Sequence, residues 1–344
     1  MAQPDVDIRH TIGKRINRDI FSDRGVLLIP ESSIINLEHL RMLRQHDITL
    51  TSRDLSPDDP QATTSISPHE IMIDEAVLQA EQLFDEVRET QKIPLADIRN
   101  NVIPILQEAA QSAHWLDLVS SLQAKGDYTY RHHIAVGAIA NILGTWLELD
   151  RQELLQLTTA ALLHDVGKML IPEHILNKPG KLTDEEYAQM KRHTVLGYEI
   201  LRITVGINHR QALVALHHHE RMDGSGYPFG LTGDKIDLFS RIVAVADVFH
   251  AMTSARIYRN PSPFYEVLYQ MERDTFGPLD PVITRLFIEK IMTGLIGHSV
   301  LLTDGSEGTI VMIHRHDPIH PLVQRENQFL DLSKDLSIHI KQIL

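Results

Sequence analysis

The sequence predicts a mainly helical protein, in which a helical domain is flanked by two small units that contain strands. Between residues 69 and 293, apolar residues recur at helical spacing, whereas short apolar runs typical of strands occur before residue 52 and after residue 294. One segment, 223–230 (DGSGYPFG), interrupts the helical region, because its glycines and proline disfavour helix. The length of 344 residues favours two or three units over one compact domain.

Residues 1–52 are predicted to form a small N-terminal accessory unit with helix and strand. The apolar runs 17–21 and 25–29 surround a turn-like segment and predict a hairpin. Leu37, Leu40 and Leu43 follow at helical spacing, which favours a small core face over a docking stripe. Residues 53–68 lack periodicity and are rich in Ser, Thr, Asp and Pro, so we interpret them as a linker.

The region 69–293 is predicted to be one helical domain. Asp150 with Glu153, and Thr183 with Glu186, match the capping-box pattern at helix starts. The run 154–163 is strongly apolar, as a central buried helix should be.

Residues 294–344 are predicted to form a C-terminal β unit. The runs 300–303 and 309–313 flank Asp304-Gly305 and indicate a hairpin, while 331–332 and 336–340 are candidates for further short strands. We expect His314, His316 and His320 to lie in a surface loop rather than in a second metal site.

Composition excludes several classes of function. The chain has no cysteine, which excludes disulfides and thiolate metal sites and favours a cytoplasmic location. No run is long enough to cross a bilayer, and the N-terminus lacks the apolar stretch of a secretory signal. The net charge of -13 argues against binding to polymeric nucleic acid. A small phosphorylated ligand is still compatible, because a metal site supplies positive charge locally.

In the helical region, histidine and aspartate occur within or next to apolar runs, at positions where a hydrophobic core normally has apolar residues. His164 and Asp165 end one apolar run, and Asp247 interrupts another. An ionised carboxylate there costs roughly 2–7 kcal/mol unless it is paired or bound to metal. Further candidates are His132, His193, His218 and His219. Apart from the two adjacent pairs, successive members of the whole set are separated by 25 to 32 residues, which places them on several helices or helix ends.

This residue set suits a metal centre built between helices. Helical bundles form dimetal sites from side chains on facing helices. Imidazole and carboxylate ligands favour iron, manganese, zinc or cobalt over calcium. Asp165 is a candidate for bridging two metals, and Lys168, three residues further on, is a candidate for contacting a phosphate oxygen.

Several segments, in this order and at these spacings, resemble the HD-GYP family of the HD phosphohydrolase superfamily. They are HDVGK (164–168), KPGKLTDEEYAQMKRH (178–193), HHERMDGSGYP (218–228), VADVF around Asp247, and SARIYR (254–259). The likeness covers residues from about 128 to 280, nearly half of the chain.

The resemblance implies an HD-type helical bundle that hydrolyses cyclic di-GMP to pGpG and onward to GMP. It implies Asp165 and Lys168 as catalytic residues, and two divalent metal ions, iron or manganese. The metal ligands that it implies are His132, His164, Asp165, His193, His218, His219 and Asp247. It implies that the substrate contacts Lys168, Tyr227, Arg256 and Arg259.

The sequence departs from the family pattern at a few positions. Tyr128 stands where members with a third metal carry a carboxylate, which favours two metals here. His250 replaces the second aspartate of a D-x-x-D signature, and we expect it near the pocket without being an essential ligand. We interpret Glu220 as a partner that orients a histidine and Asp223 as a turn residue.

Alternative functions stay open at this point. One is a phosphodiesterase for cyclic GMP–AMP, because base selectivity depends on pocket contacts that the sequence does not expose. Another is a weakly active module that binds a cyclic dinucleotide and signals by contact. Protein partners that dock on the segment 223–230, called the GYP loop below, and a homodimer, are further options.

Overall fold

The N-terminal unit of the protein is a hairpin packed with one helix. The computed structural model describes residues 11–56, 67–112, 115–122, 128–254, 263–274, 277–326 and 328–344. Strands β1 (Ile20–Phe21) and β2 (Leu27–Ile29) pair antiparallel, as predicted. Helix α2 (Leu37–Gln45) buries Leu37, Leu40 and Leu43, which confirms the predicted core face. Leu55 pairs with Ile16, and most of the predicted linker lies outside the described residues.

Helices form the body of the molecule. They are α3 (Pro68–Thr90), α4 (Leu95–Asp97), the π-helix η2 (Ile98–Val102), α5 (Ile103–Ser112), α6 (Trp115–Leu122), α7 (Tyr128–Trp146), α8 (Arg151–Leu162), the 3₁₀ helix η3 (Val166–Leu170), α9 (Glu173–Leu176), α10 (Asp184–Lys191), α11 (His193–Arg202), α12 (His209–His217), the 3₁₀ helix η4 (Gly233–Lys235), α13 (Leu238–Thr253), α14 (Phe264–Asp274) and α15 (Pro281–Gly294). This confirms the predicted mainly helical fold.

Capping residues set several helix starts. The Asp150 side chain accepts from the Glu153 amide at the start of α8, and Thr183 with Glu186 makes a full capping box on α10. At α3, Ser67 caps the Glu70 amide and Pro68 occupies the first turn, where its missing N–H costs nothing. Each cap satisfies an amide that the helix itself leaves unpaired.

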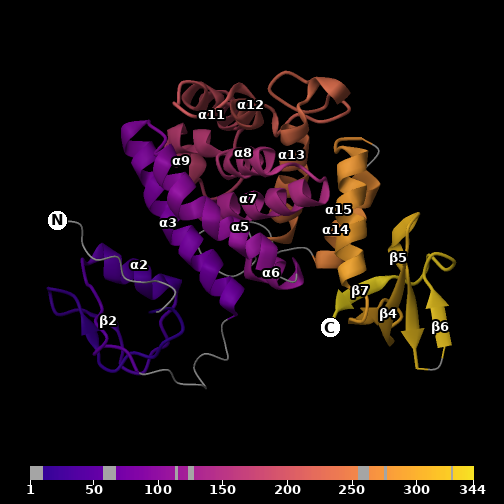
Figure 1. Ribbon diagram of the computed structural model, residues 1–344, viewed down its shortest axis with the longest axis horizontal. Helices are drawn as coiled ribbons and strands as arrows, with labels where there is room; N and C mark the ends of the chain where they lie inside the picture. Colours follow the sequence, from indigo (N-terminus) through magenta and orange to yellow (C-terminus); the bar gives the residue numbers. More distant parts are fainter. Residues whose placement is uncertain are drawn as a thin grey trace.

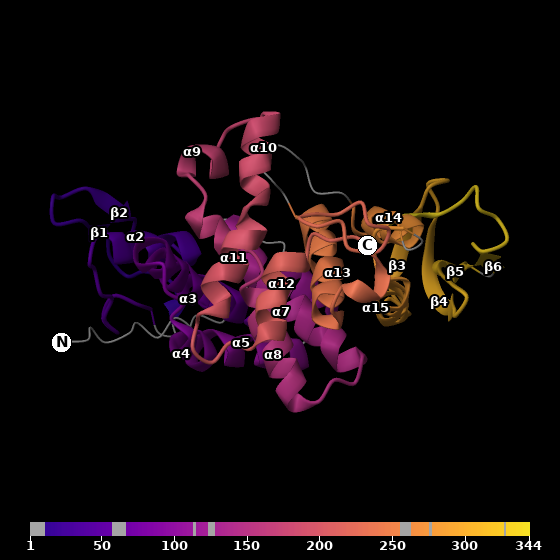
Figure 2. The same cartoon turned by 90° about the horizontal axis from the view of Figure 1, so that it is seen from above.

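The centre of the body is α7, which packs against α5, α8 and α13. The residues of α7 from 132 to 141 are all buried, and so are those of α8 from 157 to 162. Figures 1 and 2 show the N-terminal unit and the C-terminal strands at opposite ends of this helical body. No helix among the described residues is long and apolar enough to cross a membrane.

The C-terminal unit is a five-stranded antiparallel sheet in the order β6-β5-β4-β3-β7. Its strands are β3 (Ser299–Leu302), β4 (Glu307–His314), β5 (Asp317–Arg325), β6 (Gln328–Asp331) and β7 (Ile340–Ile343). The hairpin predicted around Asp304-Gly305 is confirmed, and the last strand begins at residue 340, where the predicted strand 336–340 ends.

The predicted surface loop around His314, His316 and His320 is wrong. His314 ends β4, His320 lies within β5, and only His316 is in the turn between these strands. Ile319 and Val323 are buried, and Leu322 and Val323 pair with residues of β4. Pro318 and Pro321 disfavour a strand and conceal it in the sequence. His314 contacts Asp331, and His320 contacts Asp317.

Candidate metal centre

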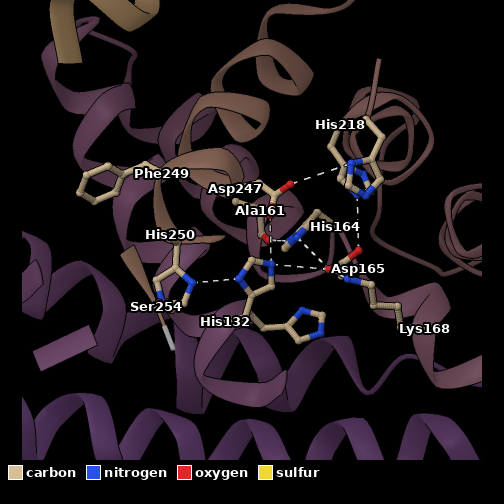
Figure 3. A network of polar contacts seen from close by, with 12 residues as sticks. His132, Ala161, His164, Asp165, Lys168, His218, Asp247, Phe249, His250 and Ser254 are labelled. Atoms are coloured by element: carbon tan, nitrogen blue, oxygen red, sulfur yellow. Dashed lines mark hydrogen bonds and ion pairs between the residues drawn. The ribbon is translucent and has the colours of Figure 1, made fainter. Parts of the chain in front are cut away.

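Seven side chains from five helical segments converge inside the helical body. Figure 3 shows His132, His164, Asp165, His218 and Asp247 among them. They are His132 on α7, His164 and Asp165 after α8, His193 at the start of α11, His218 and His219 at the end of α12, and Asp247 on α13. Six of the seven are buried, and His219 is partly buried. These are the positions that the sequence analysis selected as ligands.

Asp165 lies at the middle of this cluster. Its Oδ1 atom is 3.1 Å from His193 Nε2 and 3.4 Å from His218 Nε2. Its Oδ2 atom is 3.3 Å from His164 Nε2 and 3.6 Å from His132 Nε2. Each carboxylate oxygen therefore faces a different pair of imidazoles, which is the arrangement that a bridging carboxylate requires.

Asp247 is a second carboxylate that faces both sides of the cluster. Its Oδ1 atom is 3.2 Å from His132 Nε2, and its Oδ2 atom is 4.0 Å from His219 Nδ1. It reaches this place because α13 packs against both α7 and α12. The residues of α13 around Asp247 are mostly apolar and buried, so their packing holds the helix, and with it Asp247, in place.

Backbone carbonyls fix the tautomers of three of these histidines. His164 Nδ1 is 2.7 Å from Ala161 O, His193 Nδ1 is 2.7 Å from Met190 O, and His218 Nδ1 is 3.0 Å from Ala215 O. A carbonyl oxygen only accepts, so each Nδ1 carries the proton and donates it. The Nε2 atom of the neutral ring is then left with a free lone pair directed at Asp165, as metal ligation requires.

Burial and charge set the protonation of the cluster. Burial lowers the pKa of His218 to about 4 and that of His219 well below its usual value, so both rings are neutral at pH 7. Burial would raise the pKa of Asp165, but the positive charge of Lys168 is the largest of the effects that outweigh burial and hold that pKa well below the usual range. Asp165 is therefore an ionised carboxylate held among imidazoles.

The donor set fits divalent metal ions. The ligand atoms of Asp165, His193, His218 and His219 lie within 4.8 Å of one another, and so do those of His132, His164 and Asp165. His164 Nε2 and Asp165 Oδ1 are buried and have no partner with hydrogen-bond geometry among the described residues. Buried polar atoms without a partner are costly, and a metal ion bound between them would remove that cost.

A close packing contact brings His193 to Asp165. A Cβ atom on Gly167 would lie 2.0 Å from the His193 carbonyl oxygen and 2.5 Å from the Gly197 amide nitrogen. Only glycine allows η3 to approach α11 this closely. The glycine after His164-Asp165 is thus part of how the fold assembles the cluster.

We expect Gly167→Ala to lower the free energy of unfolding by about 1–3 kcal/mol, because backbone must move to admit the methyl group. The metal affinity should fall as well, since the shift separates His193 from Asp165. Thermal unfolding and metal titration would measure both effects. Gly277→Ala is the matched control, because its Cβ would meet nothing closer than 3.6 Å. Equal stability of the two variants would contradict this account of the packing.

Of the other predicted site residues, the structure describes Lys168 and Tyr227. Lys168 Nζ forms an ion pair with Asp165, and its side chain is 25% exposed. The 3₁₀ helix η3, rather than a continued α-helix, brings them together. The ring of Tyr227 lies 4.6 Å from that of His219, and burial raises the pKa of its phenol, which stays protonated. Arg256 and Arg259 lie outside the described residues.

The interpretation of Glu220 as a partner that orients a histidine is wrong. Its buried carboxylate instead accepts hydrogen bonds from the amides of Phe229, at 2.7 Å, and Leu231, at 2.9 Å. These two bonds hold the GYP loop against the end of α12, next to the cluster. Asp223 caps the Ser225 amide in a turn, as predicted.

Sequence reasoning missed one cation that lies close to Tyr227. Lys191 Nζ lies 5.1 Å from the ring centroid of Tyr187 and 5.8 Å from that of Tyr227. Tyr187 and Lys191 are four residues apart on α10, a spacing visible in the sequence. The contact with Tyr227 depends on how the GYP loop folds back, which the sequence does not show.

Comparisons with known proteins show which family the chain belongs to. Residues 95–281 match the family model described as HD domain. The chain is 36% identical over 242 residues, 70% of its length, to the cyclic di-GMP phosphodiesterase PA4108 of Pseudomonas aeruginosa. It is 51% identical over 127 residues, 35% of its length, to the cyclic di-GMP phosphodiesterase response regulator RpfG of Xanthomonas campestris.

A further relative is the 3'3'-cGAMP-specific phosphodiesterase 1 of Vibrio cholerae, 41% identical over 167 residues and 47% of this chain. The chain spans 58%, 32% and 38% of the lengths of these three relatives. Among solved structures, Bd1817, an HDG"Y"P protein from Bdellovibrio bacteriovorus, matches with a TM-score of 0.57 and 16% identity. That match covers 84% of this chain and 98% of the other, and it shows a shared fold.

Proposed function

Because the chain belongs to the HD domain family, in its HD-GYP branch, we propose that it is a metal-dependent phosphodiesterase that hydrolyses cyclic di-GMP to pGpG and then to GMP. The observation that supports this most is the position of Asp165, which is shared between two groups of imidazoles. A single bound metal would not need a carboxylate with histidines on both of its oxygens.

We propose that the centre holds two divalent ions, iron or manganese. One would bind His132, His164, Asp165 and Asp247, and the other Asp165, His193, His218 and His219. The set contains nitrogen and oxygen donors only, which suits these metals. When bound, such ions lower the pKa of a coordinated water and neutralise charge on a phosphodiester.

The residues around the centre would bind and orient the substrate. In hydrolysis, a water oxygen forms a bond to phosphorus while the bond from phosphorus to the 3' oxygen breaks. The 3' oxygen takes up a proton, and the new 5' phosphate stays on the linear product. Lys168 lies beside Asp165 and would hold a phosphate oxygen, Tyr227 would line the pocket and donate from its neutral phenol, and Arg256 and Arg259 would bind phosphate.

A cyclic GMP–AMP dinucleotide is the second candidate substrate, because a relative named for that specificity is 41% identical to this chain over 167 residues. The test is product analysis of the purified, metal-loaded protein with cyclic di-GMP, 3'3'-cGAMP and pGpG. We expect the fastest turnover with cyclic di-GMP. Faster turnover of 3'3'-cGAMP would reverse the substrate assignment. Tight binding without turnover would instead indicate the binding module.

We also propose a division of the chain into units at 1–52, 53–68, 69–293 and 294–344.

We propose in addition that the GYP loop docks a protein partner. Phe229 is 62% exposed although the loop that carries it is fixed by Glu220. A rigid loop that presents an exposed aromatic side chain is suited to contact another protein. Replacing Phe229 with Ser should therefore weaken partner capture without changing turnover of a cyclic dinucleotide.

Lys191 is expected to bind the phosphate of the cyclic dinucleotide that is not being hydrolysed. The Lys191→Ala variant should raise KM for cyclic di-GMP by about 10–100-fold while kcat changes little, because a charge-assisted hydrogen bond contributes roughly 1.5–3 kcal/mol. Steady-state kinetics would measure this. Lys181→Ala, an exposed lysine on the same segment, is the control. If both variants have the KM of the parent protein, Lys191 does not contact the substrate.

A further inference from the structure

One ligand histidine, His132, makes a hydrogen bond with a second imidazole through its Nδ1 atom. The Nδ1 atoms of His164, His193 and His218 donate to backbone carbonyls. The Nδ1 atom of His132 instead lies 2.9 Å from Nδ1 of His250, and the two rings are 5.1 Å apart between centroids (Figure 3). Both side chains are buried, at 4% and 2% exposure.

The direction of this hydrogen bond follows from the neighbours of each ring. His132 Nε2 faces the carboxylates of Asp247, at 3.2 Å, and Asp165, at 3.6 Å. For Nε2 to bind metal, the proton of the neutral ring must be on Nδ1. His132 Nδ1 then donates, so His250 Nδ1 must accept.

The second nitrogen of His250 completes the chain of hydrogen bonds. If His250 Nδ1 accepts, its proton lies on Nε2, which is 3.0 Å from Ser254 Oγ. Ser254 is one helical turn further along, just after α13 ends, and its hydroxyl can accept. Each donor thus has an acceptor, in the order His132, His250, Ser254.

We propose that His250 is a positioning residue that fixes the tautomer and the ring orientation of His132, as backbone carbonyls do for His164, His193 and His218. Partners of this kind raise the basicity of a ligand histidine and hold its ring in place, and removing them typically costs 10–100-fold in metal affinity. The inference rests on the metal centre of the proposed function and is independent of the identity of the substrate.

The test is the metal affinity of two variants, measured by competition with a chelator of known affinity. His250→Leu removes the acceptor, whereas His250→Asn places an amide oxygen near the position of Nδ1. We expect His250→Leu to bind Mn²⁺ about 10–100-fold more weakly and His250→Asn to recover most of that loss. Thermal unfolding of the metal-free variants would report their folding separately, and His250→Ala replaces the leucine variant if that does not fold.

Two outcomes would overturn the inference while the proposed function stands. One is parental affinity in His250→Leu, and the other is an equal loss in His250→Leu and His250→Asn, which would assign the effect to packing instead of the acceptor. If the parent protein itself binds no Mn²⁺, the metal centre of the proposed function fails, and the inference fails with it.

Discussion

Asp165→Asn is expected to abolish hydrolysis of cyclic di-GMP and to remove most of the bound metal. The reason is that both oxygens of this carboxylate face imidazoles, at 3.1–3.6 Å, so one side chain serves both halves of the cluster. The amide has nearly the same shape but carries no charge and offers one acceptor oxygen. Elemental analysis and product analysis on the same sample would measure both effects.

The control for this variant is Asp304→Asn, an exposed carboxylate in the turn between β3 and β4. It should keep the metal content and the turnover of the parent protein. Retention of two metal ions and of substantial activity by Asp165→Asn would show that Asp165 is not the shared ligand.

Lys168→Ala should have a different outcome, with metal retained and kcat lowered by about 10²–10³-fold. Its ammonium group lies beside Asp165 and is partly exposed, so it is placed to stabilise charge on a phosphate oxygen. We expect metal binding to be independent of the lysine, because the cation adds no ligand atom. Single-turnover rates and metal content of the same preparation would separate the two roles.

Lys168→Arg is a useful companion variant, since it keeps the charge and changes the geometry. We expect its activity to lie between those of the parent protein and Lys168→Ala. Loss of metal from Lys168→Ala as complete as that from Asp165→Asn would mean that Lys168 serves the metal centre and not the substrate.

Sequence alone identified the cluster because its members break a strong local pattern. Asp165 and Asp247 stand in apolar runs where a charge is costly, and the histidines recur at spacings that distribute them over several helices. The fold could be anticipated for similar reasons. Periodicity specifies helices, and the caps at Asp150 and Thr183 mark where two of them begin.

What sequence could not show were contacts between elements. The bond between His132 and His250 joins α7 to α13, residues separated by 118 positions, and depends on how those helices pack. The role of Glu220 was misassigned because the return of the GYP loop onto α12 is a tertiary feature. Strand β5 was missed because it contains Pro318 and Pro321, and proline is disfavoured within strands.

The most direct test of the proposed activity is titration of chelator-treated protein with Mn²⁺ or Fe²⁺ while hydrolysis of cyclic di-GMP is followed. We expect no turnover in the metal-free protein, an increase as metal is added, and a plateau when two ions are bound per chain. Hydrolysis at full rate by the metal-free protein, or no hydrolysis of any cyclic dinucleotide after two ions have bound, would contradict it.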